Sequence, residues 1–221
     1  MQKLHYLFKC AAEFAVDVIY PKHCAVCQRL ITGYTDTALC PACLNKSLNL
    51  KVVRDDRYRF DEAIGVLKYE GNVRRAMIKY KFKSVKYYAG AYAHVMDMAV
   101  ADRDYVKNAL ICSVPLSVTR ERDYSQTLLI ARKLASMWGS ELIEDLIIRC
   151  AHVKQLSKMR LPERRFYIKG AMDVNPRYDI YGRDILIIDD IFTSGTTANE
   201  CANVLKLHGA NSVYVLCPCY D

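Results

Sequence analysis

Apolar residues recur along the chain at two spacings, one typical of buried strands and the other of amphipathic helices. Short, mostly apolar runs predict strands at residues 61–67, 109–114, 185–188 and 213–217. Apolar residues three or four positions apart predict helices at residues 73–82, 88–100, 125–138 and 196–207. Because the predicted strands and helices alternate, the pattern indicates an α/β fold with a parallel sheet.

Three other segments are less regular. Residues 51–59 are polar and are interpreted as a linker or a domain edge, and residues 141–150 as a short helix or strand. Residues 151–183 are polar and basic with weak periodicity. Connections of this length are often functional or mobile, so this segment is a candidate for a functional loop.

The N-terminal segment combines helical spacing with charge. Apolar residues recur at helical spacing from Leu4 to Val18, but Lys9, Glu13 and Asp17 interrupt them. These charges exclude the unbroken apolar core of a signal peptide. No apolar run reaches the length of a membrane span, roughly 18 residues. We therefore expect a helix packed on the domain, no membrane span and a cytoplasmic location.

The composition fits a globular protein with a basic surface. The 221 residues suit one domain of moderate size with a small module, and 52% apolar residues exclude wholesale disorder. The formal charge of +8 favours polyanionic partners or phosphorylated ligands, although it says nothing about the fold.

Four of the ten cysteines form two CxxC pairs. Cys24 and Cys27 are separated by twelve residues from Cys40 and Cys43. A CxxC turn presents two sulfurs to one side of a metal ion, and a second turn completes a tetrahedral shell. Because four thiolates leave no open position, we predict a structural zinc site. A thioredoxin-like redox role is disfavoured, because two copies occur and no strand–helix unit surrounds either.

The remaining cysteines are scattered through apolar segments. Without an export signal they are interpreted as reduced thiols. We expect most of them to be buried and structural: Cys10, Cys112, Cys150, Cys201, Cys217 and Cys219.

The segment from Ile185 to Thr197 contains the strongest chemical signal. Its apolar strand ends in two acids, and ligands of open α/β sheets bind at such carboxyl ends. A glycine and small hydroxyl residues follow at a predicted helix start, where backbone amides attract anions. Two carboxylates would repel a bare phosphate, but they accept hydrogen bonds from ribose hydroxyls. The pattern therefore predicts a ribose 5-phosphate site at Asp189, Asp190, Thr193, Ser194, Gly195, Thr196 and Thr197.

This segment is not a Walker loop, because GxxxxGK[ST] is absent and no lysine lies in it. It resembles the motif with which type I phosphoribosyltransferases bind 5-phosphoribosyl 1-pyrophosphate (PRPP). The resemblance implies that Asp189 and Asp190 hold the ribose hydroxyls and residues 193–197 the 5-phosphate. It also implies Mg²⁺ bridging the pyrophosphate and the ribose. The alternative is a capped strand-to-helix turn with exposed acids.

Two further segments suit the same ligand. Ser113 ends a predicted strand and is a candidate for the pyrophosphate loop, together with Arg120 and Arg122, whose guanidinium groups match a diphosphate. The alternative for the arginines is a solvated helix start. Residues 155–170 are a candidate for a mobile hood that excludes water, with Arg160 as its candidate ligand-binding residue. The alternative is an ordinary surface loop.

The order of these pieces resembles the ComF family of bacterial competence proteins and their GntX-type relatives. It comprises the CxxC pairs, the strand before Pro115, RERDYSQ, the basic segment and IIDDIFTSGTT. The resemblance implies a zinc-ribbon-like module at residues 1–50 and a type I phosphoribosyltransferase-like domain at residues 51–221. It also implies a cytoplasmic role in DNA uptake during natural transformation. The family usually has RGFNQ where this chain has RDYSQ.

A basic aromatic stretch covers residues 68–88. Cations neutralise phosphates and exposed aromatic rings stack on bases, so this stretch is a candidate surface for single-stranded DNA. The alternative is an ordinary helix with buried aromatic residues and a solvated basic face. The candidate DNA-binding residues are Arg74, Arg75, Lys79 and Lys81.

These observations leave two main functional hypotheses. The first is a competence factor that binds PRPP and single-stranded DNA and works with other DNA-uptake proteins. The second is an active phosphoribosyltransferase that transfers ribose 5-phosphate from PRPP to an unidentified base or amine. The sequence identifies no catalytic residue for that transfer. A weaker third hypothesis is a sensor in which PRPP gates a partner through the zinc module.

Overall fold

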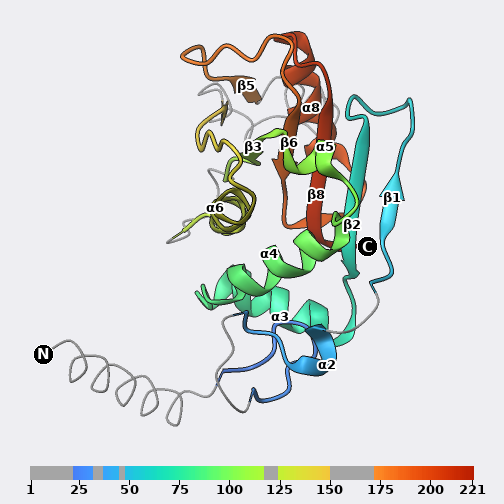
Figure 1. Cartoon of the computed structure of the whole chain (residues 1–221), viewed down its shortest axis with the longest axis vertical. Coiled ribbons are helices and arrows are strands. Elements are labelled where there is room, and N and C mark those ends of the chain that lie inside the picture. Colours follow the sequence, from blue (N-terminus) through green and yellow to red (C-terminus); the bar gives the residue numbers. More distant parts are fainter. Residues whose placement is uncertain (1–21, 32–36, 45–47, 117–123, 150–171) are drawn as a thin grey trace, which may run out of the picture.

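The computed structural model describes residues 22–31, 37–44, 48–116, 124–149 and 172–221. Its central feature is a six-stranded sheet with strand order β1-β2-β8-β6-β3, in which β7 also pairs with β8 (Figure 1). Strands β2, β8, β6 and β3 run parallel, and β1 adds an antiparallel edge. The bounds are β1 Lys51–Val53, β2 Glu62–Lys68, β3 Leu110–Ser113, β6 Ile185–Ile188, β7 Ile191–Phe192 and β8 Val213–Tyr220. The predicted α/β fold with a parallel sheet is therefore confirmed.

Helices cover both faces of this sheet (Figure 1). Helices α3 (Gly71–Phe82), α4 (Tyr88–Ala99) and α6 (Gln126–Trp138) share one buried cluster with the sheet. Helix α8 (Thr196–Leu207) and the small sheet of β4 (Ile147–Arg149) and β5 (Met172–Val174) share a second cluster on the other face. The short helices are α2 (Pro41–Leu44) and α5 (Asp104–Lys107).

Side-chain alternation along β6 separates the two faces. Leu186 and Ile188 lie in the cluster of α3, α4 and α6, whereas Ile185 and Ile187 lie in the cluster of α8. All four are fully buried, as expected for a parallel strand covered on both sides. Apolar burial on two faces explains why this segment reads as a continuous apolar run.

The register brings two strand ends together. Ser113 of β3 pairs with Ile188 of β6, so the chain segments that follow both strands begin side by side. The Val114 amide donates to the Ile188 carbonyl at 3.0 Å, and the Asp189 amide to the Leu216 carbonyl at 3.3 Å. The carboxyl edge of the sheet is thus held by backbone hydrogen bonds beyond the strands themselves.

Most predicted elements occur within two or three residues of their expected bounds. Helix α6 begins after Ser125, whose hydroxyl accepts from the Leu128 amide at 3.2 Å, and ends at Gly139 in the left-handed conformation. The linker predicted at residues 51–59 was wrong in part, because β1 forms there and pairs with β2. The segment at 141–150 contains the short strand β4. Strands β5 and β7 and helix α5 were not predicted.

The cysteine-containing segment packs directly on α3 and α4. Cys24, Ala25 and Leu39 belong to the same buried cluster as these helices. The Gln28 side chain donates to the Tyr88 hydroxyl at 3.0 Å and accepts from Lys79 at 2.7 Å. The described part of the module therefore shares its core with the sheet. The domain boundary near residue 50 stays a prediction, as does the N-terminal helix, which lies outside the described residues.

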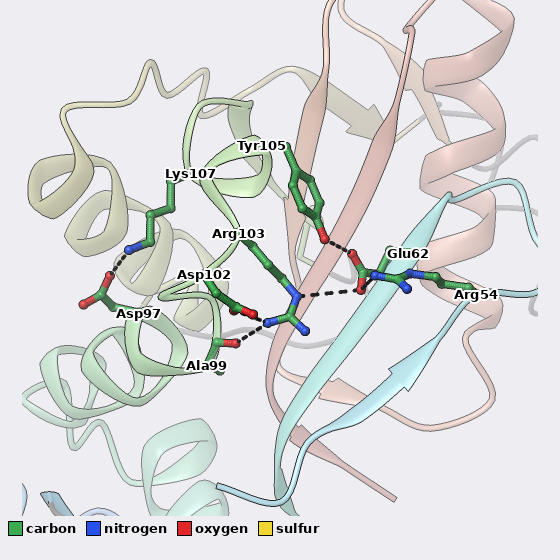
Figure 2. Close-up of polar contacts among 8 residues, drawn as sticks. All are labelled: Arg54, Glu62, Asp97, Ala99, Asp102, Arg103, Tyr105 and Lys107. Carbon is green, nitrogen blue, oxygen red and sulfur yellow. Dashed lines mark hydrogen bonds and ion pairs between the residues drawn. The ribbon is translucent and has the colours of Figure 1, made fainter.

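A buried carboxylate organises the amino edge of the sheet (Figure 2). Glu62, at the start of β2, accepts from Arg54 at 2.9 Å and from the Tyr105 hydroxyl at 2.6 Å. Arg103 lies 3.9 Å away and also donates to the Ala99 carbonyl. Both carboxylate oxygens therefore have cationic or hydroxyl partners, as a buried charge requires.

Among the described residues, no helix is long and apolar enough to cross a membrane.

Candidate functional site

The loop after β6 has the geometry of an anion site at a helix start. Gly195 adopts φ 70°, a left-handed conformation that other residues rarely take, and precedes α8. A Cβ added there would lie 3.1 Å from Phe192 and 3.2 Å from Tyr58, so the position has little room for a side chain. No side chain of the described residues caps α8. The first amides of the helix are therefore available to a ligand.

The hydroxyl side chains of this loop are exposed. Thr193, Ser194, Thr196 and Thr197 all face solvent, and the Ser194 and Thr196 hydroxyl oxygens are 2.9 Å apart. Hydroxyl donors and free helix amides therefore converge on one small region. This arrangement suits a phosphate monoester, whose oxygens accept several hydrogen bonds.

The two acids lie between this loop and the sheet. Asp189 and Asp190 are half-buried, and the Asp190 amide donates to the Asp189 carboxylate at 2.8 Å. Burial, followed by the neighbouring charge of Asp190, raises the pKa of Asp189 to about 7. A ligand that donates hydrogen bonds to this carboxyl group stabilises its ionised form.

A lysine from α3 contacts the second acid. The Lys81 ammonium lies 2.6 Å from the Asp190 carboxylate, and the two side chains are 15% and 18% exposed. This contact was missed in the sequence, where Lys81 was grouped with the DNA-binding candidates. The two residues are more than a hundred positions apart, so only the fold brings them together.

Tyr124, which ends the RERDY segment, and Gln126 fix the backbone at this lysine. The Gln126 side chain donates to the Lys81 carbonyl at 3.1 Å, and the Tyr80 hydroxyl donates to the Gln126 carbonyl at 2.7 Å. The Tyr124 hydroxyl donates to the Tyr80 carbonyl. The end of α3 is thus fixed to the start of α6, beside the acid pair.

The candidate pyrophosphate loop begins beside the acids. Ser113 is buried at the end of β3, and its register partner Ile188 directly precedes Asp189. Arg149 of β4 donates to the carbonyls of Leu116 at 2.8 Å and Pro115 at 3.2 Å, so it fixes the start of this loop. Arg149 was not predicted. Arg120, Arg122 and Arg160 lie outside the described residues, and their roles stay predictions.

The connection between β1 and β2 borders the loop that follows β6 and precedes α8. The Tyr58 hydroxyl donates to the Ser194 carbonyl at 3.3 Å, and the Arg59 amide donates to the Asn199 side chain at 2.6 Å. Tyr58 stacks on Phe60, which contacts Phe192 edge-to-face. A segment that the sequence suggested to be a linker therefore supports the loop.

The four predicted metal ligands form a cluster. The sulfur atoms of Cys24, Cys27, Cys40 and Cys43 all lie within 4.8 Å of one another, and those of Cys27 and Cys40 are 3.6 Å apart. A tetrahedral Zn²⁺ with bonds of about 2.3 Å separates its sulfurs by about 3.8 Å, so the cluster fits the ion. The Cys40 amide points at the Cys24 sulfur at 3.5 Å, an orientation that supports a thiolate.

The turns around these cysteines explain the fit. Gln28 and Ala38 adopt positive φ values of 64° and 51°. These left-handed residues turn the backbone sharply next to each CxxC pair. The Gln28 amide donates to the Cys24 carbonyl at 2.9 Å, and the Cys43 amide to the Cys40 carbonyl at 2.9 Å. Four of the other cysteines are buried and unpaired, as expected: Cys112, Cys201, Cys217 and Cys219. Burial raises the pKa of each of these thiols, which makes them unreactive.

The DNA-binding candidates divide into two groups. Arg74 and Arg75 are exposed on α3. Lys79 and Lys81 are half-buried and contact Gln28 and Asp190. The aromatic residues divide in the same way: Tyr80 and Tyr88 are buried, whereas Phe82 is 58% and Tyr87 41% exposed.

Comparison with known proteins is consistent with this arrangement. No family model matches the chain. The DNA utilization protein YhgH of Escherichia coli O157:H7 is 27% identical over 210 residues, which cover 89% of each chain. The YhgH protein of strain K12 is 26% identical over the same shares. Competence protein F of Haemophilus influenzae is 23% identical over 62% of this chain and 63% of that protein.

Solved structures with partial similarity include two phosphoribosyltransferases. A purine phosphoribosyltransferase from Pyrococcus horikoshii is 18% identical, with a TM-score of 0.35 over 57% of this chain and 70% of that chain. A hypoxanthine phosphoribosyltransferase from Staphylococcus aureus is also 18% identical, with a TM-score of 0.37 over 57% and 61%. Scores this low carry no argument, so the fold class stands on the sheet itself.

The class of the protein is now defined: an α/β chain with a mostly parallel sheet and a small N-terminal four-cysteine cluster. The chain is similar to a DNA utilization protein over 89% of its length and to a competence protein over 62%. Its motif order and its four-cysteine cluster agree with the resemblance to the ComF family.

Proposed function

We propose that this protein binds PRPP as its Mg²⁺ complex and supports DNA uptake in competence. The observation that carries the proposal is the acid pair at the carboxyl end of β6, followed by a loop with free helix amides and exposed hydroxyls. Carboxylates accept hydrogen bonds from hydroxyl groups, and the neighbouring amides and hydroxyls donate them to an anion. The two sets side by side match a ligand with hydroxyls at one end and a phosphate at the other. A phosphorylated ribose has this polarity.

Each group of residues has a distinct role in the proposed complex. The carboxylates of Asp189 and Asp190 accept hydrogen bonds from the ribose hydroxyls. The hydroxyls and amides of residues 193–197 donate to the 5-phosphate. The loop after Ser113 contacts the pyrophosphate, and Arg120, Arg122 and Arg160 are proposed to complete that region. Mg²⁺, when bound, neutralises part of the diphosphate charge.

The role in DNA uptake rests on the relatives and on exposed chemistry. Proteins named for DNA utilization and for competence align with this chain. Arg74 and Arg75 are exposed on α3, and Phe82 and Tyr87 expose aromatic rings near its carboxyl end. Cations with exposed rings suit single-stranded DNA. We propose this cytoplasmic surface as the DNA contact, with other DNA-uptake proteins as partners and a structural zinc ion in the cysteine cluster.

Titration calorimetry with PRPP and Mg²⁺ tests the first part of the proposal. Wild type is expected to bind with 1:1 stoichiometry, and Asp190→Asn to bind at least tenfold more weakly, because an amide replaces a charged acceptor. The matched control Asp184→Asn lies at the opposite end of β6. Its affinity is expected to equal that of wild type. Absence of heat with wild-type protein at two well-separated temperatures would disprove PRPP binding.

The same preparations distinguish the binding factor from an enzyme. PRPP, Mg²⁺ and a panel of bases and amines are incubated with the protein while pyrophosphate release is followed. Binding without acceptor-dependent release supports a factor, whereas turnover that Asp190→Asn abolishes supports a transferase. Metal analysis is expected to find one zinc per chain.

A further inference from the structure

We propose that Lys81 is a ligand-binding residue of the PRPP site, where it neutralises Asp190 in the free protein and contacts the diphosphate of bound PRPP. This inference rests on the proposed function. It removes Lys81 from the candidate DNA surface.

The geometry of the ion pair is the first support. The Lys81 ammonium and the Asp190 carboxylate are 2.6 Å apart, and both side chains are about one-sixth exposed. Such a pair is too shielded to belong to a freely solvated basic face, yet its residual exposure leaves it reachable from outside. An ammonium has three donors, so the bond to Asp190 leaves two for a ligand.

The position of Lys81 follows from the layers of the fold. Leu186 and Ile188 of β6 face the cluster that contains α3, and Asp190 follows two residues after Ile188. Lys81 lies in the last turn of α3 on that same face of the sheet. The pairing is therefore a consequence of the fold and not of a chance surface rotamer.

The backbone around Lys81 is fixed more firmly than a solvated lysine needs. The Lys81 carbonyl accepts from Gln126, and the adjacent Tyr80 is fully buried, with its hydroxyl bonded to the Gln126 carbonyl. The Tyr124 hydroxyl donates to the Tyr80 carbonyl. These contacts hold the base of the lysine side chain rigid, which lowers the entropy lost on binding a ligand.

The chemistry of PRPP supplies the final step. Its diphosphate is attached to C1, directly beside the carbon that bears the 2-hydroxyl group. A carboxylate that accepts bonds from the ribose hydroxyls therefore lies close to the diphosphate, and so does a cation bonded to that carboxylate. Among the described residues, Lys81 is the cation seen in direct contact with the acid pair.

Two ligands that differ in the diphosphate test this role. Lys81→Gln is expected to weaken PRPP binding by about 10- to 100-fold, the range of one charge-assisted hydrogen bond. Its affinity for ribose 5-phosphate, which lacks the diphosphate, is expected to change less than about threefold, and Lys81→Arg is expected to recover most of the PRPP affinity. The control Lys79→Gln removes a cation two residues away that contacts Gln28. It is expected to bind PRPP like wild type.

The outcomes separate this inference from the proposed function. If wild type binds PRPP and Lys81→Gln binds it equally well, Lys81 is not a ligand-binding residue. Equal losses for PRPP and ribose 5-phosphate would also contradict a diphosphate contact. If wild type binds no PRPP, both proposals fail. Should Lys81→Gln not fold, the double variant Lys81→Met with Asp190→Asn removes both charges. It must bind PRPP more weakly than Asp190→Asn alone.

Discussion

The central sheet has one carboxylate cluster at the amino ends of its parallel strands and another at their carboxyl ends. We call these the amino edge and the carboxyl edge, and the two clusters are built in opposite ways. At the amino edge, buried Glu62 is bonded to Arg54 and Tyr105, with Arg103 beside it (Figure 2). At the carboxyl edge, Asp189 and Asp190 repel each other, and in the part of the chain that the structure describes they share the cation of Lys81. The first cluster satisfies its charge within the protein, and the second leaves charge to be satisfied by something else.

This difference separates a structural role from a ligand-binding role. A buried carboxylate with three partners stabilises one arrangement of β2, α5 and the β1–β2 connection. A half-buried pair of repelling acids costs free energy in the free protein, and that cost is recovered when a ligand donates hydrogen bonds. Ligand-binding sites commonly lower the stability of the protein that carries them.

The largest expected effect is on stability at the amino edge. Glu62→Ala removes the buried acceptor of Arg54 and Tyr105 and leaves Arg103 with Asp102 as its carboxylate partner. We expect a loss of about 3 kcal/mol in the free energy of unfolding. Urea denaturation measures it. Glu144→Ala, which breaks the exposed pair with Arg132, is the control and is expected to lose less than about 1 kcal/mol. A comparable loss in both variants would contradict a special role for Glu62.

The next effect is on binding at the carboxyl edge. Asp189→Asn removes one of two repelling acids, so the protein is expected to unfold at the same or a higher urea concentration. PRPP affinity is expected to fall roughly 30- to 100-fold, because the amide also presents donors to the ribose hydroxyls. Calorimetry and urea denaturation on the same samples measure both. Simultaneous loss of stability and binding would make Asp189 resemble Glu62 and remove the contrast.

The pH dependence of stability gives a third, smaller difference. The pKa of Asp189 is raised to about 7 by burial and then by Asp190, whereas the unfolded value is near 3.8. Between these values the folded protein binds more protons than the unfolded chain, so stability falls as pH rises. Between pH 5 and pH 7 this contribution is about 2 kcal/mol. PRPP affinity should rise over the same interval, because the carboxylate is the binding form.

Urea denaturation of wild type and Asp189→Asn across this range isolates the effect. The zinc ligands also exchange protons with pH, but they are the same in both proteins, so their contribution cancels in the difference. Parallel curves for the two proteins would show that Asp189 does not titrate near neutrality.

Much of the fold was predictable because it depends on local pattern. Strand β6 is buried on both faces, so its sequence is continuously apolar, and α6 carries both a serine cap and a terminal glycine. The four cysteines were predictable for a similar reason, since metal geometry restricts their spacing. Such signals lie within a few residues of each other.

The missed features depend on contacts between distant segments. Strand β1 is three residues long, is stabilised by β2 and begins a segment that is otherwise polar, so the segment resembles a linker. Lys81 looked like any other cation of α3, because nothing near it in the sequence indicates Asp190. Arg149 and Tyr58 were missed for the same reason. Partners of a charge, and therefore its role, follow from the tertiary fold.

The smallest effect on stability concerns charges that belong to neither cluster. Arg74→Glu with Arg75→Glu changes two exposed side chains, so the free energy of unfolding is expected to change by less than about 0.5 kcal/mol. Affinity for single-stranded DNA is expected to fall. The slope of log affinity against log salt is expected to decrease by about 1.4, because each phosphate contact on a single strand contributes about 0.7. Fluorescence anisotropy with a labelled oligonucleotide measures both quantities.

The matched control for this surface is Lys133→Glu with Arg177→Glu. It changes the net charge by the same amount at exposed positions on α6 and after β5. If DNA binding depends only on the overall charge, both double variants lose affinity equally, and the surface on α3 has no special role. If the α3 variant alone loses affinity while retaining PRPP binding, the molecule has three separate uses of charge. Glu62 stabilises the fold, the acid pair with Lys81 binds PRPP, and the exposed arginines bind DNA.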